Sequence, residues 1–237
     1  MLIINEYLAG KQKAFKSHQF FRTLEKQDEF FKTMAFTPNL TFWVMTFQDI
    51  LRLIPKQITK KELRRIATHH KMEDAGHDKW FLQDISYLRK GVDYNVEWLY
   101  SPENQNIRDF TYNIVAEAIK PSSDHLKVLL ILLLESTGHV FFEHIANFAK
   151  RKGHDSDLKY FSSHHLEVEL NHSVFEGKLE EELFSIELTA KERAEAVELI
   201  DRLYEGWNNL FTDLALSFDQ RPVNQNVSYE GSEAIII

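Results

Sequence analysis

Two histidines and a glutamate recur at helical spacing in the segment HHLEVELNH. His165, Glu169 and His172 stand at positions i, i+4 and i+7, which at 100° per residue fall within about 60° of one another on one helix face. Because the chain has no cysteine, such a set of nitrogen and oxygen ligands favours iron or manganese over copper(I) or a structural zinc. The alternative is a solvated face of a charged helix, which histidine does not favour because it is a weak helix former.

A second group lies in the segment THHKMEDAGHDKW. Glu73 and His77 are four residues apart, and Asp74 and His77 are three apart. Carboxylate and histidine pairs at i, i+3 build the dinuclear sites of helix bundles, and Glu169 and His172 have the same spacing. Taken alone, this segment is equally consistent with a solvated helix.

A third group follows seven consecutive apolar residues, 128–134, in the segment LLILLLESTGHVFFEHI. A helix that is apolar on every side is buried, so Glu135 must be paired, protonated or bound to a metal. His139 follows one turn later on the same face. The alternative is a buried glutamate bonded to a neighbouring arginine or histidine.

Each group lies on a separate predicted helix, and the core of a helix bundle allows such faces to converge on one interior point. We therefore predict a dinuclear metal site, with Asp74 and His139 as further candidate ligands. Its six first candidates are Glu73, His77, Glu135, His165, Glu169 and His172.

The elements that must position these groups are long helices. The chain has only five prolines and eight glycines, and no strand alternation lasts more than a few residues. Thr59 with Glu62, and Thr189 with Glu192, have the spacing of capping boxes. We predict a single all-α domain over residues 1–218 and a mobile polar tail over 219–237. Its seven expected helices cover residues 2–26, 40–53, 59–89, 107–119, 122–151, 155–184 and 189–218.

Composition narrows the class of protein. The 237 residues are 43% hydrophobic and 27% charged, with a net charge of −8, and an acidic surface repels nucleic acid and anionic lipid. The longest apolar run is too short to span a bilayer, and the N-terminal residues do not resemble a signal peptide. We expect a cytoplasmic protein with no nucleic-acid or membrane partner. The absence of cysteine excludes disulfides, thiolate nucleophiles and iron–sulfur clusters.

The order of these motifs resembles the haem-oxygenase-like di-iron oxidases and oxygenases, which include the CADD-like proteins and the fatty-acid-decarboxylating iron-containing redox enzymes. His165, Glu169 and His172 match the family motif His-x-x-x-(Asp/Glu)-x-x-His, with glutamate in place of the more usual aspartate. Glu135 matches the family's lone glutamate in the middle of the chain. The resemblance covers roughly residues 5–218 and implies the seven-helix haem-oxygenase-like bundle shared with TenA- and PqqC-like proteins.

The second group departs from the family pattern. Family members usually place a glutamate seven residues before the histidine that aligns with His77, and this chain has His70 there. Either His70 takes that role, or Glu73 or Asp74 reaches the metal from one turn away.

The resemblance also implies a function. It predicts two iron ions, with manganese as the other option, that react with O2 and oxidise a small organic substrate such as a fatty or aromatic carboxylate. Paired aromatic residues, among them Phe42 with Trp43 and Phe141 with Phe142, either line the substrate pocket or fill the core. A homodimer is expected from the family alone.

Five other functions can be compared with the pattern. Thiaminase chemistry needs a cysteine nucleophile, which this chain lacks. Haem binding through His18 leaves the later histidines unexplained, and a ferritin-like bundle leaves His165 unexplained. A cofactor-free oxidase of the PqqC type predicts activity without metal. A non-enzymatic helical binding protein predicts that His165 and His172 are structural.

Overall fold

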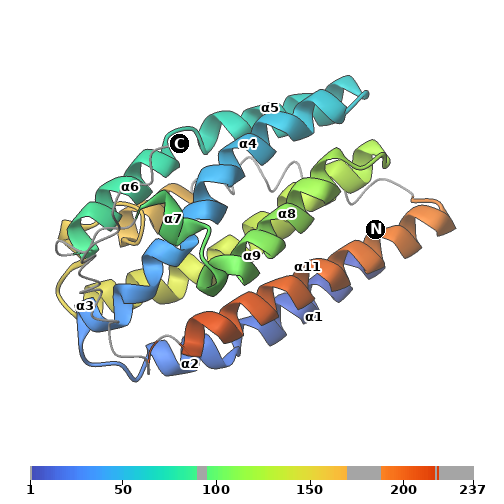
Figure 1. Ribbon diagram of the computed structural model, residues 1–237. Coiled ribbons are helices and arrows are strands. Elements are labelled where there is room, and N and C mark those ends of the chain that lie inside the picture. Colours follow the sequence, from blue (N-terminus) through green and yellow to red (C-terminus); the bar gives the residue numbers. More distant parts are fainter. Residues whose placement is uncertain (1, 90–94, 170–187, 217, 219–237) are drawn as a thin grey trace, which may run out of the picture.

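The computed structural model describes residues 2–89, 95–169, 188–216 and 218. Within these residues every regular element is a helix and no strand occurs, which confirms the all-α class (Figure 1). The α-helices are α1 (Leu2–Lys16), α2 (Gln19–Leu24), α3 (Phe30–Thr33), α4 (Thr41–Gln57), α5 (Lys61–Glu73), α6 (His77–Leu88), α7 (Val96–Leu99), α8 (Gln105–Ile119), α9 (Asp124–Arg151) and α11 (Ala190–Leu216). Three 3₁₀ helices, η1 (Met34–Leu40), η2 (Pro102–Asn104) and η3 (Asp155–Asp157), join them, and residues 163–169 are also helical.

Helix α9 lies in the middle of the bundle. It contacts α1, α2 and α11 on one side and α4, α5 and α8 on the other, and Figure 1 shows α1 and α11 side by side along one flank. All seven apolar residues at 128–134 are buried, as the sequence predicts. Burying a leucine or isoleucine side chain stabilises a fold by about 1.5–3 kcal/mol, so these roughly two turns of helix anchor the core around which the other helices pack.

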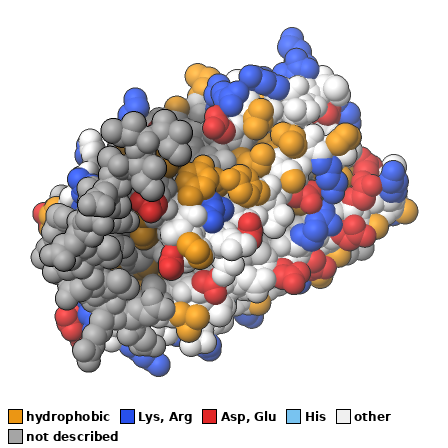
Figure 2. Space-filling model, viewed as in Figure 1, with side chains coloured by type: hydrophobic (Ala, Val, Ile, Leu, Met, Phe, Trp, Pro, Cys, Tyr) orange, Lys and Arg blue, Asp and Glu red, His pale blue; other side chains and the backbone are white. Residues whose placement is uncertain are grey.

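The length and composition of α9 would also allow it to cross a bilayer, alone among the helices of the described residues. Most of its apolar window is buried inside the protein, as in the core helix of a soluble protein. On the face shown in Figure 2, acidic and basic side chains are interspersed and the hydrophobic ones form small groups. The apolar character of α9 is therefore accounted for by the core.

Two predicted helices are each divided in the structure, so the expectation of seven is wrong in detail. The helix expected over residues 59–89 ends at Glu73 and resumes at His77. Gly76 has φ +102°, a left-handed conformation that interrupts a right-handed helix and that glycine adopts without a Cβ clash. The helix expected over 2–26 is divided near His18, whose Nδ1 accepts the backbone N–H of Phe20 and caps α2.

The two predicted capping boxes have different outcomes. Thr189 and Glu192 form one, because each side chain accepts the backbone N–H of the other, at 3.0 and 3.2 Å. Thr59 and Glu62 do not, because the carboxylate of Asp124 takes both the N–H and the hydroxyl of Thr59. Asp124 thereby ties the start of α9 to the start of α5. Of the helix predicted over 155–184, residues 155–157 form η3 and regular α-helix begins only at residue 163. Residues 170–184 and the tail at 219–237 lie outside the described residues.

Candidate metal centre

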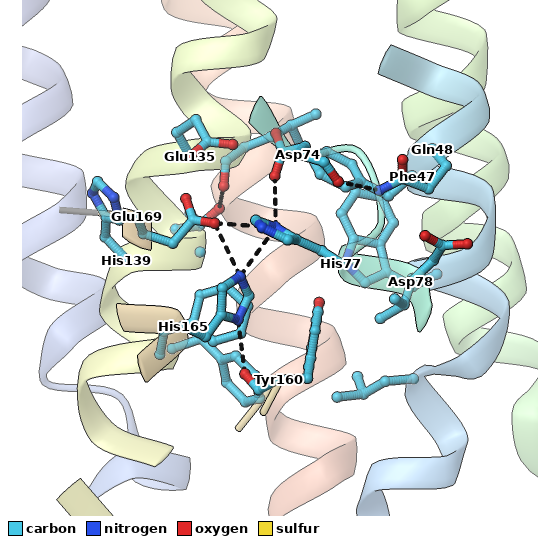
Figure 3. Close-up of a pocket in the computed structure, with 18 of the residues that line it drawn as sticks. Phe47, Gln48, Asp74, His77, Asp78, Glu135, His139, Tyr160, His165 and Glu169 are labelled. Carbon is cyan, nitrogen blue, oxygen red and sulfur yellow. Dashed lines mark hydrogen bonds and ion pairs between the residues drawn. The ribbon is translucent and has the colours of Figure 1, made fainter. Parts of the chain in front are cut away.

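Polar side chains from four helical segments meet inside the bundle, beside α9 (Figure 3). They come from α5 and its C-terminal cap, from the start of α6, from the middle of α9 and from residues 163–169. All but His139, which is partly buried, are at most 8% exposed. The set is His70, Asp74, His77, Glu135, His139, His165 and Glu169.

The first cluster consists of two imidazoles and one carboxylate. His165 Nε2 lies 3.1 Å from His77 Nδ1 and 2.9 Å from Glu169 Oε1, and His77 Nδ1 lies 3.3 Å from the same oxygen. Adjacent ligands of an octahedral ion at about 2.1 Å are about 3.0 Å apart. The three atoms thus have the spacing of one triangular face of an octahedral site, the arrangement of two histidines and one carboxylate found in non-haem iron oxygenases.

The second cluster consists of one imidazole and two carboxylates. His70 Nε2 lies 2.9 Å from Asp74 Oδ2 and 3.0 Å from Glu135 Oε1. All three residues are buried, and their ligand atoms lie within 4.8 Å of one another. Oxygen-rich surroundings with one imidazole suit the same class of ion as the first cluster.

Asp74 belongs to both clusters. Its Oδ2 faces His70, and its Oδ1 lies 3.1 Å from His77 Nδ1. On the α9 side, ligand atoms of Glu135, His139 and Glu169 also lie within 4.8 Å of one another. One carboxylate with its two oxygens directed at two ligand sets is the geometry of a bridge between two ions.

The buried charges depend strongly on one another. Burial raises the pKa of Glu135 to about 8, although the neighbouring His70 opposes this shift. Burial alone would lower the pKa of His70, but the charges of Glu135 and Asp74 outweigh it and raise that pKa well above its ordinary value. Burial likewise opposes the ionised form of Asp74, but the charge of His70 and hydrogen bonds from two imidazoles hold its pKa below the usual range. The centre is therefore one in which acids share protons with imidazoles.

This donor set fits metal ions. Three carboxylates are buried together, and among the described residues that line the adjoining cavity there is no lysine or arginine. Buried carboxylates are normally paired with a cation or bound to a metal. Protonated His70 supplies part of the compensating positive charge, and divalent ions would supply the rest.

The imidazole of His165 also has a hydrogen-bond partner on the side away from the cluster. Its Nδ1 lies 2.8 Å from the backbone carbonyl of Tyr160. A carbonyl oxygen can only accept, so Nδ1 carries the proton and Nε2 is directed at the centre. Hydrogen bonds of this kind fix the tautomer and the orientation of metal-binding histidines.

One predicted ligand lies elsewhere. Glu73 is partly exposed, and its carboxylate pairs with His69 at 2.9 Å on the outer side of α5. Of the three options for this segment, His70 and Asp74 lie in the buried cluster and Glu73 lies outside it. The buried residues of α5 are Leu63, Ile66, Ala67 and His70, and Asp74 continues that stripe at helical spacing.

The stripe is therefore the signal that distinguishes Asp74 from Glu73. Of the other predicted ligands, the structure brings together His77, Glu135, His165 and Glu169, with His139 beside them. His172 lies outside the described residues.

An apolar cavity opens beside the two clusters. It spans about 760 Å³, including space open to solvent, and Asp74, His77, Glu135, His165 and Glu169 of the two clusters line it. Its other walls come mainly from α4, α9 and α11, and they include the aromatic residues Trp43, Phe47, Phe141, Phe142, Trp207 and Phe211. Of the aromatic pairs named from the sequence, Trp43, Phe141 and Phe142 line the cavity, whereas Phe42 is not among its lining residues. An apolar cavity lined by a few convergent polar groups is typical of a small-molecule site.

His18, the candidate haem ligand, is not among the residues that line this cavity. Its Nδ1 accepts the N–H of Phe20, and its Nε2 lies 3.3 Å from the hydroxyl of Thr212. Both ring nitrogens therefore have protein partners. His18 is explained as the cap of α2.

No protein-family model matches the chain, and no curated protein matches it. The family resemblance therefore remains a prediction from the motifs, and the functional argument depends on the geometry of the centre.

Proposed function

We propose that this chain is an O2-dependent oxidoreductase with a pair of non-haem iron ions, acting on a small, largely apolar organic substrate. The observation that carries the proposal is the pair of ligand clusters joined by Asp74, whose two oxygens face His70 and His77. The first ion would be held by His77, His165 and Glu169, and the second by His70 and Glu135, with Asp74 between them. Ferrous ions in such a site supply the electrons that reduce O2.

The protein's own groups have distinct roles in this proposal. The imidazoles present nitrogen lone pairs, and His165 is kept in the required tautomer by the Tyr160 carbonyl. Glu135, whose pKa of about 8 leaves it protonated at neutral pH without metal, releases that proton when an ion binds, since ligands must be deprotonated. The aromatic walls hold an apolar substrate against the centre and exclude water. A fatty or aromatic carboxylate fits this cavity, with its acid group toward the ions and its apolar part along Trp43 and Phe211.

The test uses adjacent histidines as a matched pair. His165 is 1% exposed and belongs to the first cluster, whereas His164 is exposed. Protein purified under iron supplementation should contain about two iron ions per chain, and so should His164→Ala. His165→Ala should lose at least half of the metal. The anaerobic ferrous protein should then consume O2 in a stopped-flow or electrode measurement, and His165→Ala should do so at least about tenfold more slowly.

Three outcomes would contradict the proposal. Wild-type protein that takes up no stoichiometric iron or manganese would remove the basis for metal-dependent chemistry. Equal metal content in His165→Ala and His164→Ala would show that the buried cluster does not hold the ion. O2 consumption that persists after complete chelation would instead favour a cofactor-free oxidase.

A further inference from the structure

Asp84 is a buried acid that the proposed ligand sets do not use. It lies on α6 seven residues after His77, therefore on the same face of that helix, and it is 2% exposed. Its two oxygens accept the backbone N–H groups of Lys159 and Phe161, at 2.8 and 2.9 Å. Burial raises its pKa, although these backbone hydrogen bonds oppose the shift. A carboxylate this deeply buried is costly unless it is hydrogen-bonded, and both oxygens of Asp84 are used in this way.

One peptide group connects Asp84 to the metal centre. The N–H of Phe161, which Asp84 binds, and the carbonyl of Tyr160, which His165 binds, belong to the same peptide unit. In a trans peptide these two groups point in opposite directions. Asp84 therefore lies on one side of this peptide, and the imidazole of His165 lies on the other.

We propose that Asp84 is a positioning residue that acts on His165 through the Tyr160–Phe161 peptide. Through this peptide Asp84 sets the orientation and the basicity of the His165 imidazole, which binds the first ion. This inference rests on the proposed function, since it treats His165 as a ligand. A carboxylate bound to the peptide N–H polarises that peptide and makes its carbonyl a stronger acceptor, because hydrogen bonds in a chain strengthen one another. The stronger acceptor pulls on the Nδ1 proton and makes Nε2 a better donor to a metal.

The same contacts fix the relative position of two ligands. Asp84 holds the turn before residues 163–169 against α6, and α6 also carries His77. The Nδ1 of His77 and the Nε2 of His165 are 3.1 Å apart. A looser attachment of the turn would let this separation vary, and the first ion would be affected before the second, because His70 and Glu135 lie on α5 and α9.

The experiment compares Asp84→Asn with Asp155→Asn. Asp155 also holds this segment, by accepting the backbone N–H of Ser163 at 2.8 Å, but the Tyr160–Phe161 peptide is not its partner. Titration with Co²⁺, followed by its visible spectrum, reports the two ions separately. Asp84→Asn should weaken one of the two affinities by about 10–100-fold, the range found for groups that orient metal-binding histidines, and leave the other within about twofold. Asp155→Asn should leave both within about threefold.

Nuclear magnetic resonance of the metal-free protein tests whether Asp84 acts on His165 through the Tyr160–Phe161 peptide. The Nδ1 proton of His165 and the amide proton of Phe161 should both exchange slowly in the unchanged protein. In Asp84→Asn the His165 Nδ1 proton should move upfield and exchange at least about tenfold faster, and in Asp155→Asn it should not. Fast exchange of these two protons in the unchanged protein would overturn the inference even if Asp84→Asn failed to fold.

The two proposals fail in different ways. If the wild-type protein binds no Co²⁺, the proposed function is wrong. The exchange rate of the His165 Nδ1 proton then still tests whether Asp84 acts on His165. The inference would be overturned, and the metal centre left in place, if Asp84→Asn changed neither of the two Co²⁺ affinities nor the resonance and exchange rate of the His165 Nδ1 proton. Equal losses in Asp84→Asn and Asp155→Asn would reduce Asp84 to a general support of the turn and would also overturn it.

Discussion

At the scale of single residues, the adjacent acids Glu73 and Asp74 have opposite surroundings. The Asp74 carboxylate is 4% exposed and lies within 3.1 Å of two imidazoles. The Glu73 carboxylate pairs with His69 near the surface. The two residues have the same charge and nearly the same size. A difference in metal affinity between their variants therefore measures the role of Asp74 in the buried centre and not the change in the net charge of the chain.

We predict that Asp74→Asn lowers metal affinity and that Glu73→Gln does not. Asparagine keeps the shape but removes the negative charge and one of the two acceptor oxygens, so it cannot bridge two ions. The expected loss is at least about tenfold in affinity, measured by isothermal titration with Mn²⁺, and Glu73→Gln should stay within about twofold. The reverse order of the two variants would contradict the assignment of Asp74 as the bridge.

The sequence indicates most of these residues because their types and spacing are unusual. His165 with Glu169, and Glu135 after an apolar run, are specified by helix geometry alone. The spacing from His77 does not distinguish Glu73 from Asp74, since both lie within one turn of it, and only the buried stripe of α5 separates them. The difference between them depends on how α5 packs against α9. Asp84 has no sequence signal, because its partners are backbone N–H groups of a turn far along the chain.

At the scale of elements, the break between α5 and α6 separates the ligands of that segment onto two helices. Gly76 provides the break with φ +102°, and the open space at this position would accommodate a Cβ. The cost of a side chain there is therefore conformational, about 1–2 kcal/mol for a left-handed residue. The sequence pattern predicts one helix over residues 59–89 because an isolated glycine within a helical pattern is often tolerated.

We predict that Gly76→Ala destabilises the protein and that Gly10→Ala stabilises it. Gly10 lies within α1 and also has open space around its Cβ position, so the two sites differ mainly in backbone conformation. Alanine at position 10 should add about 0.5–1 kcal/mol to the free energy of unfolding, and alanine at position 76 should remove about 1–2 kcal/mol. Urea unfolding measures both. A stabilising Gly76→Ala would show that the helix can continue through this segment.

At the scale of the whole molecule, the buried centre links the stability of the fold to pH and to metal. In the metal-free protein the pKa of Glu135 is about 8, and that of His70 is well above its ordinary value. Unfolding returns both to their ordinary values near 4.3 and 6.5. Between about pH 5 and 8 the folded chain therefore binds more protons than the unfolded one, and its stability falls as pH rises.

We predict that the free energy of unfolding of the metal-free protein decreases by on the order of 1 kcal/mol per pH unit between pH 6 and 8. Glu135→Gln should flatten this slope. Glu192→Gln is the control, because hydrogen bonds from Thr189 hold the pKa of Glu192 at about 2. The stability that Glu192 contributes is lost only as pH falls below about 4.3, so its removal should lower stability without changing the slope between pH 6 and 8.

Metal should reverse this dependence, because bound ions replace the protons that the acids and imidazoles otherwise share. An ion present at 100 times its dissociation constant adds about 2.7 kcal/mol to the stability of the fold, and its affinity rises with pH as the ligands lose their protons. We predict that Mn²⁺ raises the melting temperature by about 5–10 °C at pH 8, since about 1 kcal/mol shifts a domain of this size by 2–4 °C. The increase should be smaller at pH 6, and in Asp74→Asn it should fall to about half or less. A metal effect that is equal at both pH values would mean that the ion binds outside the proton-sharing centre, at groups whose charge does not change in this range.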